Sequence, residues 1–143
     1  MRLRSWLAVA LLFTLSLPAA ANSKRVGDLR VYFNALPTTE LTPEVARQYG
    51  ITRSANRALL NVSVRRGEPG ADVAVPAKVL AVATNLAGQR NGVSLREVRD
   101  GEALYYLGNV PINGQDTLTF EIEVIVQGQA PIKASFRQEF FPQ

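Results

Sequence analysis

Apolar and polar residues alternate along much of the chain after residue 28, and this pattern predicts a protein built of β-strands. Successive side chains of a strand point to opposite faces, so a period of two indicates a sheet with one buried face. The clearest segment is 118–126, where apolar residues alternate with Thr119, Glu121 and Glu123. Six further strands are expected at 28–34, 57–65, 77–84, 93–99, 103–107 and 132–140.

A single short helix is expected between the first two strands. Thr42 can cap its start, Pro43 suits the first helical position and Gly50 suits the position after its end, so the helix covers residues 43–49. The dipeptide Asp100-Gly101 predicts a type I′ hairpin turn. Residues 22–27 and 85–92 lack periodicity and are expected to be connections.

This number of short strands with regular turn signals is typical of an all-β fold. We therefore expect an immunoglobulin-like antiparallel β-sandwich of about seven strands, with one short helix between the first two. The length fits one domain, residues 22–143, once residues 1–21 are set aside.

Those first residues have the three regions of a secretory signal peptide. Arg2 and Arg4 precede twelve uncharged, mainly apolar residues (6–17), and three alanines at 19–21 provide the cleavage site. A membrane-spanning helix needs about 20 apolar residues, so this stretch is too short to remain as an anchor. The sequence predicts cleavage after residue 21 and a periplasmic protein without a stable membrane anchor.

Composition narrows the classes of function. Cleavage removes Arg2 and Arg4, so the net charge falls from +4 to +2, and the remaining basic residues are scattered rather than clustered as a nucleic-acid site requires. The chain has no His and no Cys. It therefore lacks the usual ligands of zinc, copper and haem, the base of Ser-His-Asp and Cys-His triads, and any disulfide. The sequence predicts no metal or cofactor site.

Several segments together resemble the DUF4426 family of exported bacterial proteins. They are 41–46, 49–51, 53–54, 56–64, 83–86, 88–89, 96–98 and 105–107. The resemblance implies a single immunoglobulin-like sandwich of the Gram-negative periplasm and supplies no catalytic or binding residue, because the family has no assigned activity. Members often carry His where this chain has Tyr32, so any chemistry of that His is not shared.

Two polar groups are candidate binding residues. Arg53, Asn56 and Arg57, together with Asn61, can hold a carboxylate, phosphate or sugar. The alternative, which we favour, is that they fix the connection between helix and strand through backbone carbonyls.

The second group is Tyr105 and Tyr106 with Tyr32, and Arg96 is a neighbour of the two adjacent tyrosines. Adjacent strand residues face opposite ways, so one Tyr is expected in the core and the other on the surface. The surface Tyr beside Arg96 can anchor a ligand or partner, although aromatic packing across the sheet is the favoured interpretation.

The acidic residues give weaker candidates. Glu97, Asp100 and Glu102 lie near one hairpin, and Glu121 and Glu123 share the outer face of one strand. Paired carboxylates can catalyse glycoside hydrolysis, but residues on a solvated face lack the necessary pocket. One acid with two amides, Asp116 with Asn113 and Gln115, falls short of a calcium site.

Taken together, the residues favour a non-enzymatic binding or protein-interaction module whose partner is an envelope protein or a small ligand. Two alternatives stay open. One is a cell-envelope enzyme using the carboxylates near Glu97–Glu102, and the other is a chaperone-like assembly factor that pairs an exposed edge strand with clients.

Overall fold

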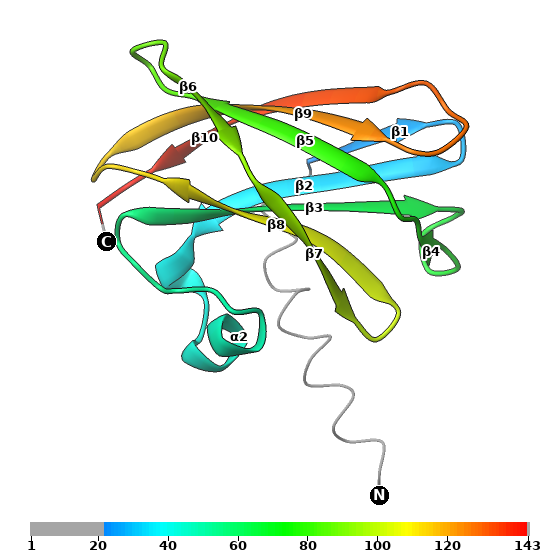
Figure 1. Cartoon of the computed structure of the whole chain (residues 1–143), viewed down its shortest axis with the longest axis horizontal. Coiled ribbons are helices and arrows are strands. Elements are labelled where there is room, and N and C mark those ends of the chain that lie inside the picture. Colours follow the sequence, from blue (N-terminus) through cyan, green and yellow to red (C-terminus); the bar gives the residue numbers. More distant parts are fainter. Residues whose placement is uncertain (1–21, 143) are drawn as a thin grey trace, which may run out of the picture.

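A computed structural model describes residues 22–142, and they form two antiparallel sheets packed face to face (Figure 1). The first sheet has the strand order β1-β2-β3-β8-β7, with a short β4 beside β3, and the second has the order β10-β9-β5-β6. The predicted antiparallel β-sandwich with one short helix is confirmed. The strands are β1 (Ser23–Val26), β2 (Leu29–Pro37), β3 (Arg57–Arg66), β4 (Val73–Ala74), β5 (Lys78–Thr84), β6 (Arg90–Val93), β7 (Leu95–Asp100), β8 (Ala103–Pro111), β9 (Asp116–Ile125) and β10 (Ile132–Phe140).

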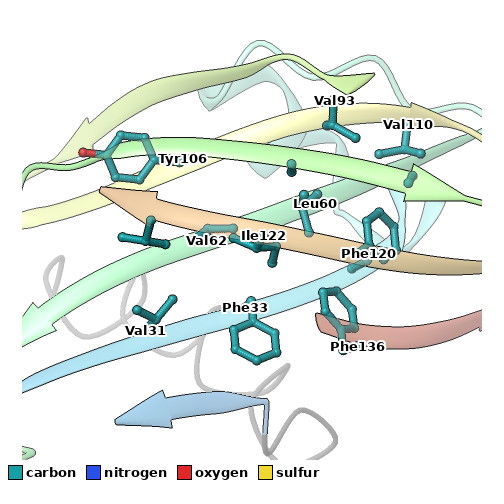
Figure 2. Packing of buried hydrophobic residues seen from close by; sticks show 14 of the residues in the cluster. Val31, Phe33, Leu60, Val62, Val93, Tyr106, Val110, Phe120, Ile122 and Phe136 are labelled. Atoms are coloured by element: carbon teal, nitrogen blue, oxygen red, sulfur yellow. The ribbon is translucent and has the colours of Figure 1, made fainter. Parts of the chain in front are cut away.

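The core lies between the two sheets and is built from the alternating apolar residues. In β9, for example, Leu118, Phe120, Ile122 and Val124 are all buried. Phe120 lies beside Phe136 of β10 in the core (Figure 2). The two rings are stacked, with centroids 4.9 Å apart and an interplanar angle of 17°. Without disulfides, this packing carries the stability of the domain.

The described residues contain ten strands rather than about seven, because three short strands carry no alternating pattern. All four residues of β1 are exposed, and β4 has only two residues. β6 contains one buried residue, Val93, and occupies part of the expected connection 85–92. Strands without a continuous buried face have no hydrophobic period from which they can be predicted.

The chain passes from the second sheet to the first between β6 and β7. β6 pairs with β5 and β7 pairs with β8, so Ser94, the single residue between them, marks the crossing. Gly108 of β8 lies directly under this point: a Cβ there would stand 2.6 Å from a methyl of Val93 and 2.9 Å from the Ser94 carbonyl oxygen. The crossing requires a residue without a side chain at position 108.

The predicted helix is present as α2 (Pro43–Gln48), preceded by the short 3-10 turn η1 (Thr38–Glu40). Thr42 caps α2 by accepting from the Val45 N–H (3.2 Å), and Gly50 follows the end with a φ of 66°. The helix covers the outer face of the first sheet, where a second apolar cluster forms from Val45, Ala46, Tyr49, Ile51, Leu59 and Leu107. This is why Leu59 interrupts the polar face of β3.

The hairpin between β7 and β8 differs from the predicted type I′ turn. Asp100 pairs with Ala103, so Gly101 and Glu102 form the two-residue loop. Gly101 has a φ of 60°, and no described residue other than glycine has a positive φ. A type I′ turn needs two positive φ values, whereas type II′ needs one at its first central residue. The backbone therefore fits type II′, with Gly101 in that position.

Residues 1–21, the predicted signal peptide, lie outside the described residues. Between residues 22 and 142 there is no helix long and apolar enough to cross a membrane.

Candidate functional site

The first predicted polar group holds the segment between α2 and β3 in place. Arg53 donates from Nη2 to the Thr39 carbonyl oxygen (3.0 Å), and the Asn56 carbonyl oxygen accepts from the Ile112 N–H (2.9 Å). Beneath them the fully buried Thr38 hydroxyl accepts from the Ser54 N–H at 2.8 Å. The Arg53 bond favours the structural interpretation of that residue, whereas the Asn56 bond is made by its backbone carbonyl and not by its side chain. The Arg57 side chain, at the start of β3, is exposed, and Asn61 lies further along that strand.

Tyr105 and Tyr106 face opposite sides of β8, as the alternation predicts. Tyr106 belongs to the core between the sheets and is only 5% exposed, and its hydroxyl accepts from the Ala77 N–H at 2.8 Å. Tyr105 faces the helix side, where its ring meets that of Tyr49 edge-on with centroids 6.4 Å apart. Arg96 donates to the Tyr49 carbonyl oxygen. The structure thus brings Arg96 and Tyr105 together around Tyr49 and places Tyr106 elsewhere.

A hydrogen bond from Tyr49 to Asp100 ties the end of α2 to β7. The Tyr49 hydroxyl donates to Asp100 Oδ2 at 2.7 Å, and Gln48 approaches the same oxygen at 3.5 Å. Burial, reinforced by the Asp100 carboxylate, raises the pKa of Tyr49 above its ordinary value of 10, and burial also raises the pKa of Tyr105. The sequence analysis named Asp100 among the acidic residues, but it did not predict the contact between Asp100 and Tyr49.

This contact predicts a pH dependence of stability at alkaline pH. A raised pKa in the folded state means that the unfolded chain loses the Tyr49 proton first, near pH 10. The stabilisation is therefore complete below pH 10 and is lost as the pH rises further. Tyr49→Phe should cost about 1 kcal/mol at pH 7 through the lost hydrogen bond. The melting temperature of this variant should then fall less steeply than that of the wild type between pH 9 and about pH 11; parallel falls would contradict the assignment.

The acidic candidates do not gather into one site. Glu97 and Asp100 are three residues apart on β7 and therefore face opposite sides, and Glu97 accepts from Arg99 at 2.9 Å. Glu121 pairs with Arg90 of β6 at 2.8 Å. Asp116 accepts from the Asn113 N–H at 3.2 Å and so closes its own turn. Across residues 22–142 no three acidic residues come close enough to hold a metal ion.

A groove of about 1050 Å³ lies along β10 and over the outer face of the second sheet. Ser23, Lys24 and Phe33 line it from the first sheet, and residues 133–135 line it from β10. Its floor on the second sheet includes Leu80, which is 46% exposed, and Val82. None of these residues belongs to the binding candidates proposed from the sequence.

The rim of this groove contains a strand position that no described strand occupies. β10 packs over β2, where Phe33 and Phe136 are 5.2 Å apart between ring centroids. The first sheet continues beyond β2 with β1, but the second sheet ends at β10. In consequence β1 has no strand opposite it, and Val26, which shares the core-facing side with its partner Leu29, remains 42% exposed.

The ladder geometry shows which backbone groups of β10 face that position. Asn85 donates its N–H to the Gln89 carbonyl oxygen (3.1 Å), which fixes the alternation of bonded pairs in the second sheet. The same alternation continues through the registers of β6, β5, β9 and β10. It follows that the backbone N–H and C=O groups of Ile132, Ala134 and Phe136 point toward β9. The residues between them point their N–H and C=O groups away from the sheet, namely Lys133, Ser135, Arg137 and Glu139.

Side chains form hydrogen bonds with only some of the outward-pointing backbone groups of β10. Lys24 Nζ donates to the Lys133 carbonyl oxygen (2.5 Å), and Gln138 donates to that of Glu139 (3.1 Å). Among the described residues, no hydrogen bond joins the backbone N–H or C=O of Ser135 or Arg137 to a partner. Nothing in the hydrophobic pattern distinguishes an edge strand from a central one, so sequence reasoning did not find this site.

Comparison with known proteins shows the family. Residues 23–143 match the family model of a domain of unknown function, DUF4426. A DUF4426 family protein from Pseudomonas aeruginosa has a similar structure at 34% sequence identity and a TM-score of 0.71, and the match covers 85% of this chain and 95% of that one. No curated protein matches the chain in sequence.

More distant structures share the fold alone. FetP of uropathogenic Escherichia coli strain F11, recombinantly expressed in the periplasm of E. coli BL21(DE3), has a TM-score of 0.62 at 11% identity, with 87% of this chain and 95% of that chain covered. A copper-bound variant of FetP has the same TM-score and identity, with 97% of that chain covered. The sequence motifs, the family match and the closely similar structure agree that this chain belongs to the DUF4426 family.

Proposed function

We propose that this protein is a non-enzymatic interaction module of the periplasm that binds an extended segment of another protein as an added strand beside β10. One observation carries the proposal: the outward backbone groups of Ser135 and Arg137 face a strand position that the second sheet leaves empty. Strand addition uses such groups for affinity, because each N–H and C=O of the edge can pair with the incoming backbone. The predicted signal peptide supports the location.

The shape of the site supports a protein partner over a small ligand. The groove is open to solvent and is lined by charged side chains, among them Lys24, Glu123 and Lys133, and the outward backbone groups of β10 follow its rim at regular spacing. Small-molecule sites are instead enclosed and mostly apolar. An added strand would also lie opposite β1 and cover the exposed Val26.

Copper binding, which is known for a FetP variant, is not extended to this chain. Copper is held in proteins mainly by imidazole and by sulfur ligands. The sequence contains no His and no Cys, and its one Met is Met1, within the predicted signal peptide. The residues present do not fit that metal.

Ser135→Pro tests the proposal directly. The Ser135 N–H points away from β9, so proline there removes a donor to an added strand without breaking the existing ladder. Proteins crosslinked in periplasmic extract to a photoreactive residue at position 137 should be recovered with the wild type and lost, by about tenfold or more, with Ser135→Pro. Circular dichroism melting checks that the variant is folded.

Ser135→Ala is the matched control, because it changes the same side chain and keeps the N–H. It should recover the same crosslinked protein as the wild type. A photoreactive residue in place of the exposed Glu44, in α2, controls for random contact. Equal crosslinking by Ser135→Pro and Ser135→Ala would refute strand addition at this edge.

A further inference from the structure

We infer that the segment accepted by β10 is acidic, with apolar residues at alternate positions. This inference rests on the proposed function and specifies the chemistry of its partner. The observations behind it are the charges of the β10 edge, the direction in which its side chains point and the uncovered side of β1.

The edge of β10 carries cations that form no ion pair within 4.0 Å with any described residue. Lys133 and Arg137 are exposed on the outer face of the second sheet, and Lys24 of β1 reaches the same edge. Among the described residues none of these three has a carboxylate within 4.0 Å, although Lys133 lies across the ladder from Glu123. Arg137 has Thr119 as its neighbour. Along this edge Lys24, Lys133 and Arg137 outnumber the one exposed acid of β10, Glu139, so the charge of the edge favours an acidic strand.

The register of an added strand places its charges. Lys133, Ser135, Arg137 and Glu139 would form the hydrogen-bonded pairs with the added strand. Within each pair, the two side chains lie on the same face of the sheet and interact directly. An acid opposite Lys133, an acid opposite Arg137 and a base opposite Glu139 would complement β10. For an antiparallel strand, this corresponds to the order Lys-x-Glu-x-Thr-x-Glu from its N-terminus.

The intervening positions of the added strand would point between the sheets. There they would meet the core-facing side of β1, including Val26, and the groove wall formed by Phe33 and Ala134. Apolar residues at these positions would remove exposed apolar surface from water. Lys24 need not leave the Lys133 carbonyl oxygen, which has a second lone pair for the incoming N–H.

A second copy of this chain fits less well. Antiparallel pairing of two β10 strands centred on Phe136 would place Lys133 opposite Glu139 of the other copy. However, the first sheet extends beyond β10 by the width of β1. β1 of each copy would then collide with β2 of the other. A single extended segment is therefore the better occupant.

Synthetic peptides test the inferred chemistry on the mature protein. Fluorescein-labelled Lys-Val-Glu-Val-Thr-Val-Glu should bind about tenfold more tightly than Lys-Val-Lys-Val-Thr-Val-Lys, because two favourable charge pairs replace two repulsive ones. The double variant Lys133→Glu/Arg137→Glu should reverse this order, and 0.5 M salt should reduce the preference. Fluorescence anisotropy measures each affinity, and Ser135→Pro should weaken binding of both peptides.

The outcomes separate this inference from the proposed function. If both peptides bind equally and Ser135→Pro weakens both, strand addition stands and the acidic preference is wrong. If the acidic peptide binds equally to wild type and Ser135→Pro, the charges act without strand addition and both ideas fail. A concentration-dependent dimer that Ser135→Pro dissociates, measured by analytical ultracentrifugation, would show that a second copy is the occupant and overturn the inference.

Discussion

Phe120→Ala should destabilise the domain by about 3–5 kcal/mol, the usual cost of truncating a buried Phe. Phe120 is 0% exposed and stacks on Phe136, which in turn contacts Phe33, so its ring joins β9, β10 and β2 (Figure 2). Removing it leaves a cavity between the sheets that rigid strands cannot close. The loss is a large share of the 5–15 kcal/mol by which such domains are stable.

Urea denaturation followed by circular dichroism measures this effect, since the only Trp lies at position 6, outside the mature domain that the sequence predicts. Thermal melting should shift down by roughly 10–20 °C. Leu86→Ala is the control: Leu86 is 74% exposed, and its truncation should change stability by less than about 0.5 kcal/mol. Similar losses in both variants would mean that Phe120 does not occupy a close-packed core.

Gly108→Ala should cost about 1–3 kcal/mol, the range expected when a methyl group is forced into a packed site. The added Cβ would stand 2.6 Å from Val93, 2.8 Å from Leu95 and 2.9 Å from the Ser94 carbonyl oxygen. The side chains can rotate, but the Ser94 backbone lies in the single residue between two paired strands. The overlap with the added methyl group can therefore be relieved only if the backbone at the crossing between the two sheets moves.

Gly92→Ala provides a matched comparison, because Gly92 of β6 directly precedes Val93, one of the residues that crowd Gly108. A Cβ at Gly92 would meet no heavy atom within 4 Å, and its φ does not lie in the left-handed region. This variant should keep wild-type stability or gain slightly, because alanine restricts the unfolded chain. Urea denaturation of the two variants distinguishes crowding at the crossing from a general effect of replacing glycine in strands; equal losses would contradict the crowding.

The long strands and the helix could be predicted because their signals are local. The alternation in residues 118–126 matches β9. The bounds of α2 are predicted to within one residue by its cap Thr42, its first residue Pro43 and Gly50 after its end. Alternation also predicted that one of Tyr105 and Tyr106 is buried, but it did not say which. That choice depends on which face of β8 meets the second sheet.

The candidate site shows a sharper limit. Arg53, Asn56 and Arg57 are noticeable in the sequence as polar residues close together, yet the Arg53 side chain bonds to the backbone of Thr39 and Arg57 is exposed at the start of β3. Ser135 and Arg137 look like ordinary solvent-facing residues of an alternating strand. Their importance comes from backbone groups, which are the same for every residue type except proline.

Local patterns in the sequence predicted the seven long strands, the helix, the absence of imidazole and thiol chemistry, and export. The tertiary structure alone decided that β10 is an edge strand beside an empty position, and that Lys24 reaches Lys133, 109 residues away along the chain. Periodicity records which side of a strand is buried. Which strands lie side by side, and which edge stays unpaired, depends on contacts between distant residues, and these leave no periodic trace in the chain.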